Sequence, residues 1–450
     1  MAELFGREGV RGKLDRHLAD RLSGSAPTLL AVTGMPGVGK TALALDWSKD
    51  RASSFPDGQL YVDLRGFEND APVTPTSALH AFLTALGQPA GTLPKEVHEL
   101  SAMYRTALAG RRMLILLDNA QSADQVRPLL PNSPGSVTIV TSRSRLTGLA
   151  IRDGAVRIEL GCLSEPASIR LLAEIIGTDR VYAEPEAAAA LVSLCGNLPL
   201  ALHITGELLA RHPVHPLSEW LDVMTGNPDQ LDSLDTPGDP TTSLRAVFSW
   251  SYLALPAATS RMFRLLGLSD EPEIDASQIF RAFAEEKEVG ARLAVLVDSH
   301  LLTSPAPDRY RLHKLVHLYA RERAEAEEDP EYLVDFARRL RRGQRGEPSA
   351  GTCGHPLPLL RSQRIEYEGE AGTLALDKRG LMLHGARPEG ASDHRPNSSG
   401  TCVTIGGTAQ LAHLHGPEGH GAEGCPLGLP DSECRDSELR VAWAVPSSTG

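Results

Sequence analysis

Hydrophobic and polar positions along the chain follow two kinds of pattern. Between residues 28 and 161, runs of leucine and β-branched residues alternate with amphipathic helical patterns, and the runs lack polar alternation. Such runs are typical of parallel strands that helices cover on both faces. They predict a doubly wound parallel α/β sheet with strands at 28–33, 58–64, 112–118, 136–142 and 156–160.

The flanking patterns are helical. We expect a short helix over 5–24, and apolar residues recur at helical spacing from 164 to about 224. Residues 225–241 are rich in Asp, Pro, Gly and Thr, which is typical of a linker. Several short helices and then a hairpin near 301–312 follow, which is the order of a winged helix.

The composition changes after about residue 345, where Gly, Pro, His and Ser dominate and the periodicity is lost. Such a segment buries too little apolar surface to fold, so we expect 343–450 to be a disordered, low-complexity tail. The helix that begins at Glu331 also stops near Arg342 without a helix-end signal. A reading-frame shift near 343 is therefore an alternative, which the other two frames of the coding DNA would reveal.

Composition narrows the functional class. The chain has 450 residues and a net charge of −12, which argues against a protein that coats nucleic acid. No apolar run approaches the ~20 residues that span a bilayer. The N-terminus has no basic segment followed by an apolar one, so we expect no signal peptide and a cytoplasmic location without membrane contact.

Residues 34–41 read Gly-Met-Pro-Gly-Val-Gly-Lys-Thr, a G-x-x-x-x-G-K-T loop between a predicted strand and a predicted helix. The glycines let backbone N–H groups converge on a phosphate, and the helix dipole adds positive charge there. Lys40 can reach the β- and γ-phosphates of ATP or ADP, and the Thr41 hydroxyl can bind Mg²⁺. The alternative is a glycine-rich turn that binds nothing. The predicted nucleotide contacts of this segment are Gly34, Pro36, Gly37, Val38, Gly39, Lys40, Thr41 and Ala42.

A metal-binding acid is expected at the end of a buried strand. Asp118 follows four apolar residues and is the candidate, with a helix-capping role as the alternative. Its neighbour is Asn119, which can orient a water but cannot take its proton. We therefore expect at most slow ATP hydrolysis, unless Asp63 or another group substitutes.

Arg143 ends the next predicted strand, within Thr141-Ser142-Arg143. An arginine at this place can contact a γ-phosphate and so distinguish ATP from ADP. The alternative is a surface arginine, since Arg145 lies two residues further on. The candidate catalytic residues are Lys40, Asp118, Asn119 and Arg143.

Five spaced motifs together resemble the NB-ARC family of STAND-class P-loop ATPases, and the likeness extends over roughly residues 4–325. The resemblance is greatest to the NB-ARC module of actinobacterial SARP-type transcriptional regulators. The motifs are Phe5-Gly6-Arg7-Glu8, 34–41, 114–118, Thr141-Ser142-Arg143 and Gly196-Asn197-Leu198-Pro199-Leu200.

The resemblance implies an ATP/ADP signalling switch. It assigns Phe5, Gly6 and Arg7 to adenine, Pro199 to packing against the nucleotide, and His313 to the β-phosphate of ADP. Lys314 stands where the family has an aspartate that helps to lock the resting form, so the lock is in doubt here.

The implied domain organisation has five parts. They are an adenine-contacting segment and helix at 1–24, a P-loop domain at 25–162, a helical domain at 163–230, a winged-helix domain at 241–328 and the tail at 343–450.

Two other functions compete with the switch. Residues 309–323 carry several basic side chains, so the winged helix could bind DNA directly, although the acidic chain disfavours this. A metabolic kinase is the other, but no substrate-binding signature is present. Besides nucleotide, the expected partners are an unknown effector or sensor protein and, in the ATP state, further copies of the chain.

Overall fold

The computed structural model describes residues 5–22, 28–67, 71–226, 231–234, 243–341, 374–377 and 380–383. The chain divides into two compact units, residues 1–347 with 436–450, and residues 348–435. In the second unit, β9 (Leu374–Asp377) pairs antiparallel with β10 (Gly380–Leu383). The rest of the tail predicted at 343–450, together with its frameshift alternative, lies outside the described residues.

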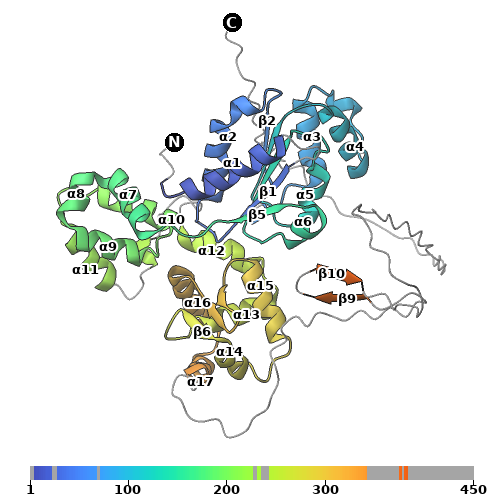
Figure 1. Ribbon diagram of the computed structural model, residues 1–450. Coiled ribbons are helices and arrows are strands. Elements are labelled where there is room, and N and C mark those ends of the chain that lie inside the picture. Colours follow the sequence, from blue (N-terminus) through green and yellow to red (C-terminus); the bar gives the residue numbers. More distant parts are fainter. Residues whose placement is uncertain are drawn as a thin grey trace, which may run out of the picture. The chain divides into compact units, whose positions relative to one another are not determined.

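A five-stranded parallel sheet is the centre of the first unit, with strand order β2-β3-β4-β1-β5 (Figure 1). All five predicted strands are present, each within two residues of its expected bounds. The strands are β1 (Thr28–Thr33), β2 (Gln59–Asp63), β3 (Leu114–Asp118), β4 (Val137–Ser142) and β5 (Val156–Glu159).

Helices cover both faces of the sheet, and the three central strands β1, β3 and β4 are buried at every position. The edge strands β2 and β5 depart from the predicted pattern, because their buried residues alternate with more exposed ones. Residues of β1 alternate between two apolar cores, with Leu30 and Val32 in one and Leu29 and Ala31 in the other. The helices around the sheet are α1 (Glu8–Leu22), α2 (Lys40–Asp50), α3 (Pro75–Ala85), α4 (Val97–Leu108), α5 (Ala123–Val126) and α6 (Thr147–Arg152).

The next segment is wholly helical, as predicted. Its helices are α7 (Glu165–Ile176), α8 (Thr178–Ala183), α9 (Pro185–Leu194), α10 (Pro199–Ala210) and α11 (Leu217–Gly226). Pro199 and Pro185 each stand at the first position of a helix, where the missing N–H costs no hydrogen bond.

Residues 244–341 combine helices with a three-stranded antiparallel sheet of order β6-β8-β7. The predicted hairpin is formed by β7 (Thr303–Ala306) and β8 (Arg309–Arg311), whereas β6 (Glu273–Asp275) has only three residues and gave no periodic signal. The helices are α12 (Leu244–Leu253), α13 (Ala257–Leu266), α14 (Ala276–Ala282), α15 (Val289–Asp298), α16 (Lys314–Glu327) and α17 (Pro330–Arg341).

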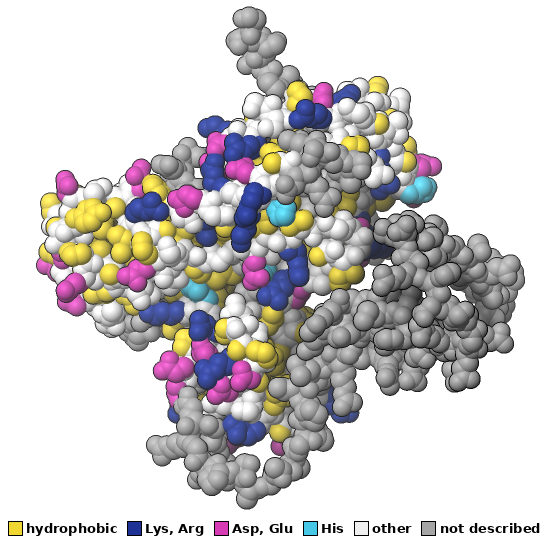
Figure 2. All heavy atoms as spheres, viewed as in Figure 1, with side chains coloured by type: hydrophobic (Ala, Val, Ile, Leu, Met, Phe, Trp, Pro, Cys, Tyr) yellow, Lys and Arg dark blue, Asp and Glu magenta, His cyan; other side chains and the backbone are white. Residues whose placement is uncertain are grey.

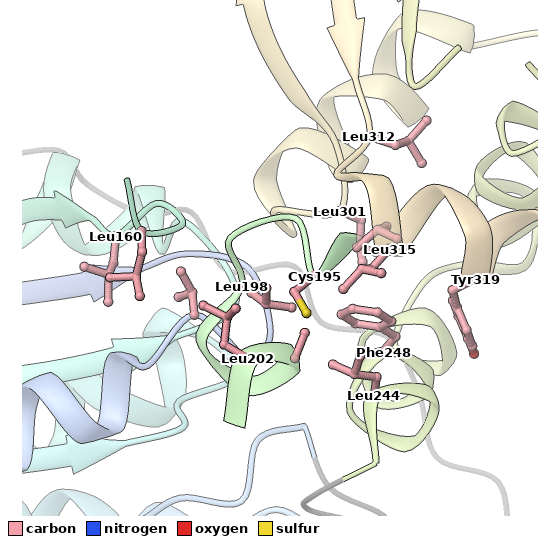
Figure 3. Packing of buried hydrophobic residues seen from close by; sticks show 14 of the residues in the cluster. Leu160, Cys195, Leu198, Leu202, Leu244, Phe248, Leu301, Leu312, Leu315 and Tyr319 are labelled. Carbon is pink, nitrogen blue, oxygen red and sulfur yellow. The ribbon is translucent and has the colours of Figure 1, made fainter. Parts of the chain in front are cut away.

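One apolar core continues from the P-loop face of the sheet through the helical segment into residues 244–341. Figure 3 shows its middle, where Cys195, Leu198 and Leu202 lie near Phe248 and Leu315. The start of α10 lies against the loop that precedes α2, where the Leu200 N–H donates to the Gly37 carbonyl oxygen at 3.2 Å. No helix among the described residues is long and apolar enough to cross a membrane.

Candidate functional site

The loop between β1 and α2 has the conformation that its glycines predict. Gly37 and Gly39 have φ of 76° and 92°, in the left-handed region that side chains disfavour. At Gly34, an added Cβ would lie 2.4 Å from the carbonyl oxygen of Leu160. No side chain caps the N-terminus of α2, so its first-turn N–H groups can bind an anion.

A cavity of about 660 Å³ opens beside this loop. The predicted site residues that line it are Phe5, Arg7, Gly37, Val38, Gly39, Lys40, Thr41, Ala42, Asp118, Asn119, Arg143 and Pro199. Gly6, Gly34, Pro36 and His313 are not among its lining residues.

Lys40 is folded back onto its own loop. Its Nζ donates hydrogen bonds to the carbonyl oxygens of Gly34, at 2.9 Å, and Met35, at 3.0 Å. Burial, with a smaller effect of the Arg143 charge, lowers the pKa of Lys40 to about 7. A phosphate in the cavity would give this ammonium group the charged partner that it lacks in the loop.

Thr41 and Asp118 meet at the other side of the loop. The Thr41 hydroxyl donates to Asp118 Oδ1 at 2.9 Å, and the Thr141 hydroxyl donates to the same oxygen. Burial raises the pKa of Asp118, which is 4 % exposed. A hydroxyl and a carboxylate so placed fit the oxygen ligands that Mg²⁺ prefers.

Asp63 stands next to this pair. In the parallel register of β2 and β3 it is the partner of Asp118, and both residues line the cavity together with Asn119. Its Oδ1 accepts a hydrogen bond from the Arg65 backbone N–H at 2.9 Å. The sheet therefore places a second carboxylate at the site, which the sequence indicated only as a possible substitute.

Arg143 reaches from the cavity to α12. Its Nη1 donates to the carbonyl oxygen of Val247 at 2.7 Å and to Ser251 Oγ at 3.3 Å. The guanidinium carbon also lies 5.6 Å from the Phe67 ring centroid and 5.3 Å from that of Trp250, within cation–π range. The predicted phosphate-sensing arginine thus connects the sheet to the 244–341 segment.

The loop that follows Arg143 continues this connection. Asp298, at the end of α15, accepts hydrogen bonds from Ser144 Oγ at 2.9 Å and from Thr147 Oγ1 at 3.3 Å. His300 Nδ1 lies 3.5 Å from Glu159 Oε1 on β5, and this contact lowers the pKa of Glu159 to about 2. The carboxyl ends of β4 and β5 are therefore both attached to residues 244–341.

The opposite end of the cavity is mostly apolar. The buried Arg7 side chain donates to the carbonyl oxygens of Gly161 and Val38, both at 2.8 Å, and so joins the N-terminal segment to the phosphate loop. Phe5 and Pro199 line the cavity as predicted. Thr141 and Leu200 also line the cavity and stand in the quoted motifs, although the sequence assigned them no contact. Sequence reasoning missed the other lining residues, namely Asp46, Leu163, Leu171, His203, Val247 and Trp250.

His313 contacts the turn that precedes α10. Its Nε2 lies 2.8 Å from the carbonyl oxygen of Gly196, and its Nδ1 accepts from the Leu315 N–H at 3.3 Å. A Cβ at Gly196 would lie 2.5 Å from the His313 ring. His313 therefore attaches residues 244–341 to the helical segment, and its contact with a phosphate stays a prediction.

The basic stretch that suggested DNA binding is largely paired. Glu273 accepts hydrogen bonds from Arg309 and Arg311, Arg323 pairs with Glu327, and Arg321 donates to the carbonyl oxygens of Gly267 and Ser269. On the face shown in Figure 2, positive and negative side chains lie interspersed over this segment. The stretch therefore presents less uncompensated positive charge than the sequence suggested.

Comparison with known proteins agrees with this geometry. The sequence profile of an AAA domain matches residues 23–138, which contain the phosphate loop and the strand that ends in Asp118. The chain is 42% identical over 336 residues to the regulatory protein AfsR of Streptomyces griseus, which covers 74% of this chain and 34% of that protein. These matches agree with the resemblance to STAND/NB-ARC P-loop ATPases that the sequence motifs indicate.

Two further relatives widen the comparison. The regulatory protein AfsR of Streptomyces coelicolor is 41% identical over 309 residues, covering 68% of this chain and 30% of its own length. The disease susceptibility protein LOV1 of Arabidopsis thaliana is 26% identical over 275 residues, covering 57% of this chain and 30% of its own length. The chain thus spans about a third of the length of these relatives.

Proposed function

We propose that this chain is a nucleotide-dependent switch, in which ATP and ADP determine how residues 244–341 attach to the P-loop sheet. The observation that carries the proposal is the position of Arg143. Its guanidinium group lines the nucleotide-sized cavity and at the same time hydrogen-bonds α12.

The physical basis is a competition for this one guanidinium group. On α12, Arg143 bonds a neutral carbonyl and a neutral hydroxyl. A γ-phosphate would offer charged oxygens, and charge-assisted hydrogen bonds are about twice as strong as neutral ones. ATP supplies this group and ADP lacks it, so the two nucleotides differ in affinity for the attached and detached arrangements. Only such a difference can shift the population.

The remaining residues take roles around the phosphates. Lys40 would contact the β- and γ-phosphates, while Thr41 and Asp118 would hold Mg²⁺, whose charge neutralises the phosphate oxygens. Phe5, Arg7 and Pro199 belong to the adenine end of the site. Because Asn119 cannot accept a proton, hydrolysis is slow and depends on Asp63.

The proposed domain boundaries separate the segment that detaches, the winged-helix domain, from the P-loop and helical domains to which it attaches. We propose a P-loop domain at 25–162 behind the segment 1–24, a helical domain at 163–230 and a winged-helix domain at 241–328. The hairpin of β7 and β8 supports the winged helix, which here contacts the other two domains through Arg143, Asp298 and His313.

The relatives named as regulatory proteins suggest where the switch acts. We propose that it controls transcription or another signalling output as part of a longer regulator. An effector or sensor protein would read the detached winged helix, and self-association in the ATP state is a further proposal.

Nucleotide content and turnover of the purified protein test the function. We expect bound ADP and slow ATP hydrolysis, and we expect neither in Lys40→Ala. An empty site with rapid hydrolysis would contradict the switch, because the protein would then cycle without a resting state.

A further inference from the structure

A second cavity lies at the amino ends of the central strands β1 and β4, away from the phosphate loop at their carboxyl ends. It has a volume of about 410 Å³, and its lining includes Thr28, Leu29 and Thr138. These residues stand where β1 and β4 begin, whereas the phosphate loop follows the carboxyl end of β1 (Figure 1). Pockets of roughly 300–1,000 Å³ are typical of small-molecule sites.

Arginines from three separate elements line this cavity. Arg105 comes from α4, Arg127 from the turn after α5, and Arg152 from the end of α6. Asp153 is the one acidic residue of the lining, and its carboxylate accepts from Arg127 Nε at 3.0 Å. The lining therefore has a formal charge of +2, in a chain whose net charge is −12.

Two of these arginines are without partners. Within the described part of the chain, neither Arg105 nor Arg152 makes a hydrogen bond or an ion pair, and both are exposed. Unpaired guanidinium groups that share a concave lining are suited to bidentate contacts with a phosphate or a carboxylate.

The cavity also contains a buried hydroxyl that lacks a partner. Thr138 is 1% exposed, and among the described residues its Oγ1 makes no hydrogen bond. A buried polar atom in this condition destabilises the protein unless a ligand or water completes it. An anionic oxygen in the cavity would accept a hydrogen bond from it.

We propose that this cavity binds a small phosphorylated molecule carrying at least two negative charges. Arg105 and Arg152 would contact the phosphate groups and Thr138 would donate to one of their oxygens. The apolar part of the lining is limited to Leu29, Leu130 and Pro131, so the ligand is mainly polar. Because the two cavities lie at opposite ends of the same strands, nucleotide and this ligand can bind together.

The test uses inorganic pyrophosphate as the probe and isothermal titration calorimetry as the readout. The protein is first saturated with ADP, so that the phosphate loop is filled. We expect saturable binding of one pyrophosphate to the ADP-filled protein. Lys40→Ala, whose phosphate loop has lost its ammonium group, should bind pyrophosphate equally well without added ADP. The double variant Arg105→Gln/Arg152→Gln should weaken binding at least tenfold.

A matched control removes the same charge elsewhere. Arg281 and Arg338 are exposed residues of α14 and α17, and the double variant Arg281→Gln/Arg338→Gln should bind within about twofold of the parent. Absence of saturable binding, or an equal loss in both double variants, would overturn the proposal.

Thr138→Val separates a binding role from a structural one, because valine keeps the shape and removes the donor. We expect binding several-fold weaker and, since the unpartnered hydroxyl is gone, a higher thermal midpoint of the ligand-free protein. Unchanged affinity would exclude the Thr138 hydroxyl from the site.

Discussion

The two walls of the nucleotide cavity are built in different ways. The wall from the sheet carries Lys40, Thr41 and Asp118, which hydrogen-bond within their own segment. The wall from α12 carries Val247 and Trp250, and its hydrogen bonds to the sheet come from Arg143. In the proposed switch, the first wall binds phosphate in either arrangement of the chain, whereas the second exists only while residues 244–341 are attached.

The proposed switch therefore assigns affinity to one wall and nucleotide discrimination to the other. Changes on the sheet wall should weaken ATP and ADP together. Changes at the α12 wall should alter the preference between them and leave a substantial affinity for both.

The largest expected effect is at Lys40. Lys40→Ala removes the buried ammonium group, whose charge-assisted bonds to phosphate are worth about 1.5–3 kcal/mol each. We expect binding of both nucleotides to weaken by roughly 100-fold, measured by calorimetry. Lys49→Ala changes an exposed lysine of the same helix and should bind like the parent. Retained affinity in Lys40→Ala would show that the loop does not bind the phosphates.

The next effect is that of Asp63→Asn, which tests ATP hydrolysis separately from nucleotide binding. If its carboxylate takes the proton of the attacking water, Asp63→Asn should lower turnover by about 100-fold, as expected for loss of a general base. Affinity for ATP should stay within a few-fold, and Asn119→Ala should lower turnover less. Equal turnover in Asp63→Asn and the parent would remove Asp63 from the reaction.

The α12 wall is tested at Trp250. Trp250→Leu removes the ring on which Arg143 stacks, a contact worth about 0.5–2 kcal/mol. Detachment should become easier, so the preference for ATP over ADP should rise about fivefold in competition binding. The control is Leu253→Ala, which changes a residue of α12 that is 70% exposed. The same shift in both variants would mean that the stacking contact plays no special part.

The smallest expected effect is the uptake of a proton by Lys40 when ADP binds. The ligand-free pKa of Lys40 is lowered to about 7, so at about pH 8.5 the free protein holds this side chain mostly neutral. Phosphate favours the charged form, and ADP binding should therefore take up close to one proton at that pH and almost none near pH 5.5. Calorimetry in buffers of different ionisation enthalpy measures the uptake. Zero uptake at both pH values would mean that Lys40 is charged in the free protein.

The sheet wall could be predicted from the sequence because its signals are local. The loop at 34–41 and the apolar run before Asp118 each act within a few neighbouring residues. The α12 wall could not be predicted in this way. Trp250 lies on an ordinary amphipathic helix, and only tertiary packing brings it to Arg143.

The contact of His313 with the helical segment also carried no local signal. The structure places its ring against Gly196, where a side chain would collide with it, and the phosphate contact that the motif resemblance suggested stays a prediction. The sequence around Leu171 and His203 likewise gives no sign that these residues line the cavity. Each lies on a helix, and tertiary packing decides which face of that helix meets the cavity.

Hydrogen exchange of the α12 amides, residues 244–253, tests the central claim most directly. The protein is measured with saturating ADP and with a non-hydrolysable ATP analogue, and the amides of β3 serve as an internal reference. We predict faster exchange in α12 and at residues 298–300 with the ATP analogue, and unchanged exchange in β3. Equal exchange in α12 with both nucleotides would contradict the account, because the nucleotide would then not determine how residues 244–341 attach.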